Sequence, residues 1–423
     1  MIIKSPLRPL HTTAVRRLWA GQAVALFGAE LHLVVIAWLA LEITGSGLAL
    51  GTVLVAGVLP RTVFTLLGGV LADRMGHRPV LLSCNLLRAV VVMALAIVVA
   101  GGHLRLWHLY IVGTVLGTLT SFYAPALFSA IPRECRQGDV RAANALIRGT
   151  AEAVGVVGPV LGGFIVAVAG TVPAVWMTGA CYLLSALPLT MLQRAPRTHP
   201  GFTEGAPKQR KSVLSDMAGS FAVVARDRFL RRVLLFVSIA GLTLTGPITV
   251  GVPWLARETF GSTAIGFGLL LSMWTAGTLV GVTASGSLSR TPRWRVLVTT
   301  VCLVLGVCMV GLGLADNLTT AAVCLFGMGT AAGSFNIFLM TWLQQRAPTA
   351  MIGRVMSIAE FAEIISTPVS FLLAGALLDV SVAWLFGGAG LLLAVASLVV
   401  VLSRDVPDSE PRTTETRAHG GGG

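Results

Sequence analysis

The sequence predicts an all-α membrane protein of twelve transmembrane helices, arranged as two pseudo-symmetric bundles of six. Apolar residues make up 55% of the 423-residue chain and charged residues only 12%, whereas soluble globular proteins carry about 25% charged residues. The apolar residues gather in runs long enough to cross the hydrocarbon layer as helices, which takes about 20 residues. The longest polar stretch, about residues 194–232, divides these runs six and six.

Each predicted span is an apolar run bounded by a short polar or glycine-containing turn. The spans are placed at residues 16–42, 48–72, 80–101, 107–131, 144–169, 173–193, 233–256, 263–288, 296–315, 319–344, 356–378 and 383–403. Basic N-terminal residues lead into a full-length span, so no cleavable signal peptide is expected. We predict an N-terminal bundle of residues 1–193, a linker of 194–232 that ends in an amphipathic helix, a C-terminal bundle of 233–403 and a disordered tail of 404–423.

The net charge of +13 has a distribution that indicates membrane topology rather than nucleic-acid binding. With the N-terminus placed in the cytoplasm, 26 of the 31 Lys and Arg residues fall in the termini, in the linker or in loops on the cytoplasmic side. An excess of basic residues on that side is the usual pattern of membrane proteins. We therefore expect a multi-pass protein of the inner (cytoplasmic) membrane, surrounded by lipid, with both termini cytoplasmic.

The sequence offers no pattern for a metal, a cofactor or a catalytic centre. The six cysteines lack metal-ligand spacing, and all but Cys135 lie inside predicted spans. The chain has no G-x-x-x-x-G-K-[ST] loop for ATP and no H-E-x-x-H motif. An intramembrane enzyme is therefore not expected, and transport by this chain would draw its energy from an ion gradient.

The two halves form a weak parallel repeat. An offset of 217 residues aligns Gly69 with Gly286 and Arg78 with Arg295, and a second correspondence places Arg141 near Arg354. Parallel repeats related by an axis along the membrane normal place a binding site near the midplane between the halves.

A charged turn follows the second span and carries the most specific motif. Residues 69–78 read GVLADRMGHR, which resembles the loop 2–3 signature of the major facilitator superfamily, with His77 at a usually basic position. In span 5, Gly158-Pro159-Val-Leu-Gly162-Gly163 resembles the antiporter signature of that family. The segments EITGSGLALG (42–51), LPR (59–61), RAANAL (141–146) and QRAPTAMIGRVM (345–356) are similar to the macrolide-efflux and enterobactin-exporter branch.

The resemblance implies the major facilitator fold and a conformational lock between spans 2 and 11. It assigns the locking acid to Asp73, with the N-terminal end of span 11 as partner, where a helix carries partial positive charge. The residues expected in this lock are Gly69, Asp73, Arg74, Gly76, Arg78 and Arg354. The alternative is that Asp73 is a solvated loop charge.

Glycines in span 5 predict a bendable, closely packed helix. Gly155, Gly158, Pro159, Gly162 and Gly163 form the expected hinge, because proline kinks a helix and glycine lets helices approach closely. Packing alone is the alternative explanation.

Charges within the spans are costly and often mark a transport pathway or a partner pair. Glu30 lies near the middle of span 1 and is a candidate for proton coupling or for binding a cationic cargo, or else a structural acid. Glu360 and Glu363 share one face of span 11, where two close carboxyl groups do not both ionise easily, so one of them is a second candidate for proton coupling. Arg61 of span 2 is expected to pair with one of them across the halves, unless each reaches water separately.

The remaining polar residues of the spans have simpler interpretations. Arg148 and Glu152 stand four residues apart and are expected to form a structural ion pair. Arg88 is expected to snorkel to the cytoplasmic surface. As residues that line a cavity for cargo, Gln22, Tyr123 and Asn336 are candidates, although each is also explained by packing.

These patterns predict a secondary active transporter, and the resemblance implies that it is an exporter. It would move a small amphipathic compound, such as a drug, an antibiotic or a siderophore, in exchange for protons by alternating access, as a monomer. Uptake of a nutrient and a transport-dead sensor or partner are the alternatives.

Overall fold

The computed structural model describes residues 8–135, 138–192, 228–287, 294–346 and 352–402, although the side chains of 65–74, 228–234, 287, 294–295, 342–346, 352–364 and 399–402 are not described. The described chain is helical almost throughout. Its elements are η1 (Arg8–His11), α1 (Thr13–Thr44), α2 (Gly47–Met75), α3 (His77–Ala100), α4 (Leu106–Glu134), α5 (Val140–Ala169), α6 (Thr171–Thr190), α8 (Arg228–Gly246), η2 (Pro247–Gly251), α9 (Val252–Trp254), η3 (Leu255–Thr259), α10 (Ala264–Ser287), α11 (Trp294–Gly313), α12 (Leu318–Arg346), α13 (Ile352–Leu378) and α14 (Val382–Leu402).

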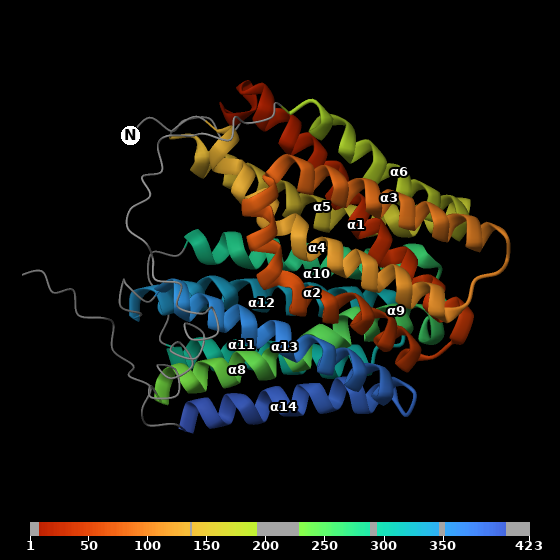
Figure 1. Cartoon of the computed structure of the whole chain (residues 1–423). Coiled ribbons are helices and arrows are strands. Elements are labelled where there is room, and N and C mark those ends of the chain that lie inside the picture. The colour runs from red at the N-terminus through yellow and green to blue at the C-terminus, as the bar shows by residue number, and fades with distance from the viewer. Residues whose placement is uncertain (1–7, 136–137, 193–227, 288–293, 347–351, 403–423) are drawn as a thin grey trace, which may run out of the picture.

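The helices form two bundles that lie side by side (Figure 1). Helices α1–α6 make the N-terminal half, and α8 to α14 make the C-terminal half. Among the described residues, ten helices are long and apolar enough to span a membrane, and Ile365–Leu378 and Val382–Leu398 are two shorter apolar helices. The predicted fold of twelve helices in two bundles is therefore confirmed. The linker predicted at 194–232 lies mostly outside the described residues.

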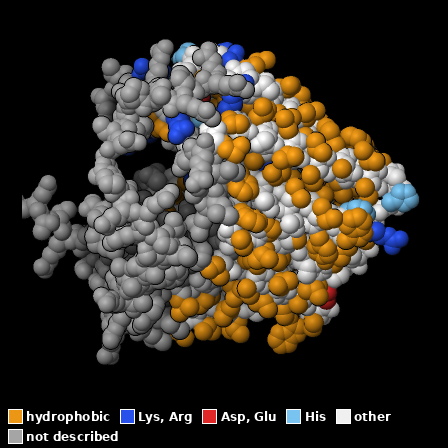
Figure 2. Space-filling model, viewed as in Figure 1, with side chains coloured by type: hydrophobic (Ala, Val, Ile, Leu, Met, Phe, Trp, Pro, Cys, Tyr) orange, Lys and Arg blue, Asp and Glu red, His pale blue; other side chains and the backbone are white. Residues whose placement is uncertain are grey.

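The two ends of the bundle differ in their connections. We call the end with the turns at residues 45–46, 101–105, 170, 260–263, 314–317 and 379–381 the short-loop end, and the opposite end the linker end. Figure 2 shows a broad apolar surface over the helices between these ends, with coloured charged side chains near the ends. Apolar side chains suit contact with the hydrocarbon layer. Within that layer, each helix also satisfies its own backbone hydrogen bonds.

Single glycines make two of the tightest turns. Gly76 alone separates α2 from α3 with φ of 82°, and Gly170 alone separates α5 from α6 with φ of 88°. Side chains other than glycine are strained at such positive φ values. Gly76 of the predicted signature is therefore required by the turn itself.

The halves meet mainly through two antiparallel helix pairs, α5 with α10 and α2 with α13. Within each half, α2 packs on α4, α3 on α6, α10 on α12 and α11 on α14. The interface between the halves is therefore formed by the helices that carry the predicted hinge and the predicted lock.

Candidate functional site

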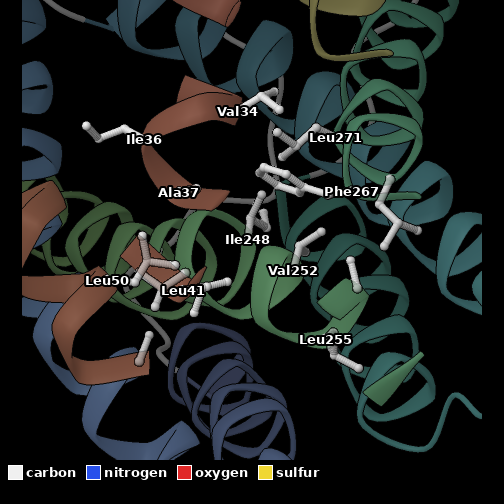
Figure 3. Packing of buried hydrophobic residues seen from close by; sticks show 14 of the residues in the cluster. Val34, Ile36, Ala37, Leu41, Leu50, Ile248, Val252, Leu255, Phe267 and Leu271 are labelled. Atoms are coloured by element: carbon white, nitrogen blue, oxygen red, sulfur yellow. The ribbon is translucent and has the colours of Figure 1, made fainter. Parts of the chain in front are cut away.

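A continuous apolar plug joins the halves toward the short-loop end. Figure 3 shows side chains of α1 and α2 packed against η2, α9, η3 and α10. The plug includes Val34, Ala37, Leu41 and Leu50 from the N-terminal half and Ile248, Val252, Leu255, Phe267 and Leu271 from the C-terminal half, all buried. Burying apolar side chains stabilises this contact by about 25 cal/mol per Å² of apolar surface. The described structure is therefore closed at the short-loop end.

Helices α2 and α13 approach to backbone contact at the same end. A Cβ atom on Gly51 would lie 2.5 Å from the carbonyl oxygen of Phe371, and one on Gly375 would lie 2.6 Å from that of Gly47. Small residues permit such close approach of membrane helices. A cation–π contact adds to the closure, with the Arg257 guanidinium 5.4 Å from the centre of the Trp38 ring.

The predicted hinge of α5 is also the surface that packs on α10. Gly163 abuts the backbone of Ala264, and Gly268 of α10 abuts that of Pro159, so closely that a Cβ on either glycine would overlap the opposing carbonyl oxygen. A Cβ on Gly155 would lie 3.2 Å from Thr275. Close packing of these glycines is therefore observed, and their role as a hinge stays a prediction.

The seventh span departs from regular α-helix where it lines the plug. Its segments η2 and η3 are π-helical, and π-helical turns are frequent at functional sites. At the start of η2, the Gly246 amide donates a hydrogen bond to Ser370 Oγ of α13 at 2.7 Å. Nothing in the sequence pattern indicated this irregularity apart from Pro247 and Pro253.

Glu30 lies where α1 crosses α5. A Cβ on Gly158 would lie 2.7 Å from the Glu30 Cβ and 3.0 Å from its Cγ. The residue is half-buried and lies near the middle of α1. Next to Gly158, Pro159 contacts Gly268 of the other half. Glu30 therefore contacts the α5 residue next to Pro159, and Pro159 lies in the interface between the halves.

Arg148 and Glu152 continue the face of α5 that meets α10. Residues 148, 152, 155, 159 and 163 recur every three or four positions, so they share one side of the helix. Arg148 is exposed and Glu152 is half-buried. Their predicted ion pair is not among the pairs that the described side chains form. The ion pair stays a prediction.

Arg88 has a buried position that the sequence analysis missed. Its side chain donates to Thr120 Oγ1 at 2.9 Å, and its guanidinium lies 4.6 Å from the Tyr123 ring centre and 5.7 Å from that of Tyr182. Only 7% of the residue is exposed. The prediction that Arg88 snorkels to the surface is therefore wrong, because hydroxyl and aromatic partners solvate the charge inside the bundle.

Two of the predicted cavity residues belong to this same cluster. Tyr123 donates a hydrogen bond of 2.7 Å to Gln22 Oε1, and both residues are buried. The cluster ties α1, α3, α4 and α6 together. A role for either residue in binding cargo stays a prediction, as it does for Asn336, which is exposed on α12.

Two basic residues at the start of α3 bind the ends of α4 and α6, at the linker end of the N-terminal half. His77 is buried and contacts Glu134 at the end of α4, with 2.9 Å between Nε2 and Oε1. Arg78 donates to the carbonyl oxygens of Leu189 and Thr190 at the end of α6. Cationic side chains stabilise helix C-termini in this way. In this conformation, Arg78 binds within its own half.

Other predicted residues lie beyond what the structure describes. Nothing is described of the side chains of Asp73, Arg74, Arg354, Glu360 and Glu363, nor of contacts made by Gly69. Arg61 is exposed on α2 just after Pro60, and its carbonyl oxygen accepts a hydrogen bond from Ser121 at 3.2 Å. The lock and the pairing of Arg61 with Glu360 or Glu363 stay predictions.

The described residues contain no group of three His, Cys, Asp or Glu side chains that could hold a metal ion. Outside the spans, burial is the main cause that raises the pKa of the Cys135 thiol, and the carboxylates of Asp139 and Glu134 raise it further. A protonated thiol is a poor metal ligand and a poor nucleophile.

Two six-helix bundles that meet at glycine-rich helix pairs, with an acid at their junction, define a membrane transporter of the two-bundle type. Residues 18–367 match the sequence pattern of the Major Facilitator Superfamily. The chain belongs to this family.

Its relatives include transporters named for efflux. The chain is 27% identical to the multidrug efflux pump Tap of Mycolicibacterium fortuitum over 83% of its length and 86% of Tap. It is 22% identical to macrolide efflux protein A of Streptococcus pyogenes, with coverage of 86% and 88%. Identity to the enterobactin exporter EntS of Citrobacter koseri is 27%, covering 69% of this chain and 67% of EntS.

A solved structure shows the same fold. The nucleoside transporter NupG superposes with a TM-score of 0.74 at 15% identity, covering 92% of this chain and all of NupG. The branch indicated by the sequence motifs is thus confirmed by the relatives, and the fold by this structure.

Proposed function

We propose that this protein is a secondary active exporter, which moves a small amphipathic compound out of the cell in exchange for protons. The position of Glu30 carries the proposal. It is a half-buried acid in the middle of the first span, and its stem rests on α5 beside the contact of Pro159 with Gly268. Intramembrane acids mark ion and substrate pathways by default. The efflux names of Tap, macrolide efflux protein A and EntS favour export.

Coupling would work through the junction of the two halves. A carboxylate at Glu30 favours a state in which water or a cationic cargo reaches it, and a neutral carboxylic acid tolerates a closed apolar surrounding. Because α5 contacts both Glu30 of α1 and the glycines of α10, protonation of Glu30 and the arrangement of the halves would bias each other. Each would shift the other's equilibrium by the same free energy.

The register of α2 against α13 supports the pairing proposed for Arg61. Gly51 is level with Phe371. Ten residues onward along α2 is Arg61, and ten residues back along the antiparallel α13 is Phe361, within one turn of both Glu360 and Glu363. An ion pair here would hold the linker end closed when the halves rock toward each other.

The same register supports the proposed lock of Asp73. From the level of Gly51 with Phe371, 19 residues along both helices bring Val70 level with Ile352, where α13 begins. Asp73 follows three residues later, within one helical turn of that level. An acid at this helix N-terminus is favourable by about 0.3–1 kcal/mol. Asp73 would thus lock the linker end in the state opposite to the one described.

The proposed orientation places the linker end in the cytoplasm. Basic residues crowd the termini and the linker, and such residues are retained on the cytoplasmic side. The described conformation would then be closed toward the outside. We further propose that the protein acts as a monomer in the bacterial inner membrane, because each chain contains both halves of the site.

Proton flux in inverted membrane vesicles tests the proposal. A respiratory substrate acidifies the vesicle lumen and quenches a pH-sensitive dye, and macrolides, other antibiotics, siderophores and cationic dyes are then added singly. We expect at least one compound to restore fluorescence, and Glu30→Gln to abolish the response. Glu42→Gln, which neutralises an exposed acid on the same helix, should leave the response intact.

The outcomes separate the competing functions. A response that survives Glu30→Gln would remove this acid from the coupling path. Uptake of a compound driven in the opposite direction would establish a nutrient importer. No flux in either direction, from protein that is correctly inserted, would favour a sensor or an assembly partner.

A further inference from the structure

Asp379 binds the start of a helix that belongs to the other half. It follows the last residue of α13, in the turn before α14, and it reaches α2. One carboxylate oxygen accepts a hydrogen bond from the Gly47 amide and the other from the Ser46 hydroxyl, each at 2.9 Å. The acid thus caps the N-terminus of α2 across the interface between the halves.

The first turn of α2 depends on this contact for one of its backbone donors. The Ala49 amide donates to Ser46 Oγ at 3.2 Å, and the Leu50 amide donates to the Ser46 carbonyl oxygen at 3.3 Å. Both acceptors belong to Ser46, in the turn just before α2. The Gly47 amide has its acceptor in the C-terminal half instead. A helix N-terminus carries partial positive charge, so the Asp379 carboxylate suits it both as an acceptor and as an anion.

The position of Asp379 is that of a latch rather than of a structural core residue. It is exposed, whereas Leu378 beside it is buried against Gly47. Water can therefore replace both hydrogen bonds when α2 and α13 separate. The contact favours the closed arrangement of the short-loop end without preventing its opening, since exposed charge contacts contribute little to stability.

We propose that Asp379 is the latch of the short-loop end, a residue that biases the transporter toward the state closed there by capping α2 from the opposite half. The inference goes beyond the proposed function, since it assigns a gate residue that needs neither a cargo nor a proton. Together with the proposed lock of Asp73, it gives the α2–α13 pair one acid-to-helix contact at each end. Each contact would stabilise the state in which the other is broken.

The test measures access to the plug in purified protein in lipid nanodiscs, where both ends are open to reagent. Ala37→Cys places a reporter in the plug, at a residue that is now 1% exposed. A water-soluble maleimide is added, and labelling of each cysteine is followed by peptide mass spectrometry. The buried native Cys84, in the interior of the N-terminal half, reports unfolding. The parent without the reporter gives the background.

We expect Asp379→Ala to raise the labelling rate of the reporter about fivefold, as expected for the loss of about 1 kcal/mol of bias. Asp379→Asn keeps the size of the side chain but loses its charge, and it should raise the rate by a smaller factor. Asp316→Asn is the matched control. It neutralises an exposed acid at the same end, in the turn between α11 and α12.

The labelling rates either support or overturn the assignment of Asp379 as the latch. An unchanged reporter rate in Asp379→Ala and Asp379→Asn, with Cys84 still protected, would overturn the latch. So would an equal increase in Asp316→Asn. If Cys84 becomes labelled in Asp379→Ala, that variant is unfolded. The reporter rate in the isosteric Asp379→Asn then decides whether Asp379 is the latch. The assay involves no transport, so its failure and the failure of the export proposal are distinguishable.

Discussion

Glu30 rests its side-chain stem on the backbone of Gly158, with 2.7 Å between the Glu30 Cβ and the place a Cβ on residue 158 would occupy. No other residue type fits at 158 without moving α1 or α5. The next residue, Pro159, meets Gly268 of the C-terminal half. The acid proposed for proton coupling is therefore supported by the helix that forms the interface between the halves.

Gly158→Ala is expected to impair transport strongly. The added methyl group would press on the Glu30 stem and displace α1 from α5, at a cost of about 1–3 kcal/mol. Transport in the vesicle assay should fall about tenfold, since 1.4 kcal/mol corresponds to a factor of ten. Gly149→Ala is the matched control on the same helix, because a Cβ there would meet no atom within 4 Å. Equal activity of the two variants would contradict the proposed support of Glu30.

The interface between α5 and α10 yields a second prediction. A Cβ on Gly268 would overlap the carbonyl oxygen of Pro159, so Gly268→Ala should force α10 away from α5. We expect the short-loop end to close less completely and the Ala37→Cys reporter to label faster. Gly387→Ala lies on α14, where a Cβ would meet no atom within 4 Å. It should leave the labelling rate of the reporter equal to that in the parent. The same nanodisc measurement checks both variants.

The sequence predicted the fold well because lipid imposes strong rules. Spans of about 20 apolar residues, turns and the positive-inside asymmetry can be read locally. The span predicted at 16–42 is observed as Thr13–Thr44, and that predicted at 144–169 as Val140–Ala169. The closely packed glycines of α5 also stood out, since a proline among glycines is visible in any sequence.

The sites were harder, since they depend on which faces of different helices meet. Arg88 could not be distinguished from a snorkelling arginine, because its partners Thr120, Tyr123 and Tyr182 come from α4 and α6. No sequence pattern singled out Asp379, since its partner Gly47 lies 332 residues away. Sequence spacing predicts which residues are neighbours along one helix, whereas contacts between helices can be identified only once their packing is known.

Removal of the buried arginine should destabilise the N-terminal half. Arg88→Ala deletes the hydrogen bond to Thr120 and the cation–π contacts with Tyr123 and Tyr182, and it leaves a cavity. We expect a loss of about 2–4 kcal/mol, as for other large-to-small changes in a core. Arg88→Lys should lose less, because it keeps the charge but not the planar stacking.

Thermal melting in detergent measures these losses, and Arg133→Ala is the control. Arg133 is exposed near the end of α4. A melting temperature of Arg88→Ala equal to that of Arg133→Ala would show that the cluster contributes nothing to stability.

Charge exchange tests the proposed pairing of α2 with α13 at the linker end. Arg61→Glu should add a third acid opposite Glu360 and Glu363 and reduce transport strongly, and Glu363→Arg should also reduce it by placing a second cation opposite Arg61. The double variant restores opposite charges and should recover a substantial part of the activity, because residues that interact directly give non-additive effects. Glu360→Arg combined with Arg61→Glu shows which acid is the partner. Additive losses in both double variants would remove the ion pair from the transport cycle. Arg61 would then act on the cargo or on its own half, even though it lies within one turn of Glu363 in the register of the two helices.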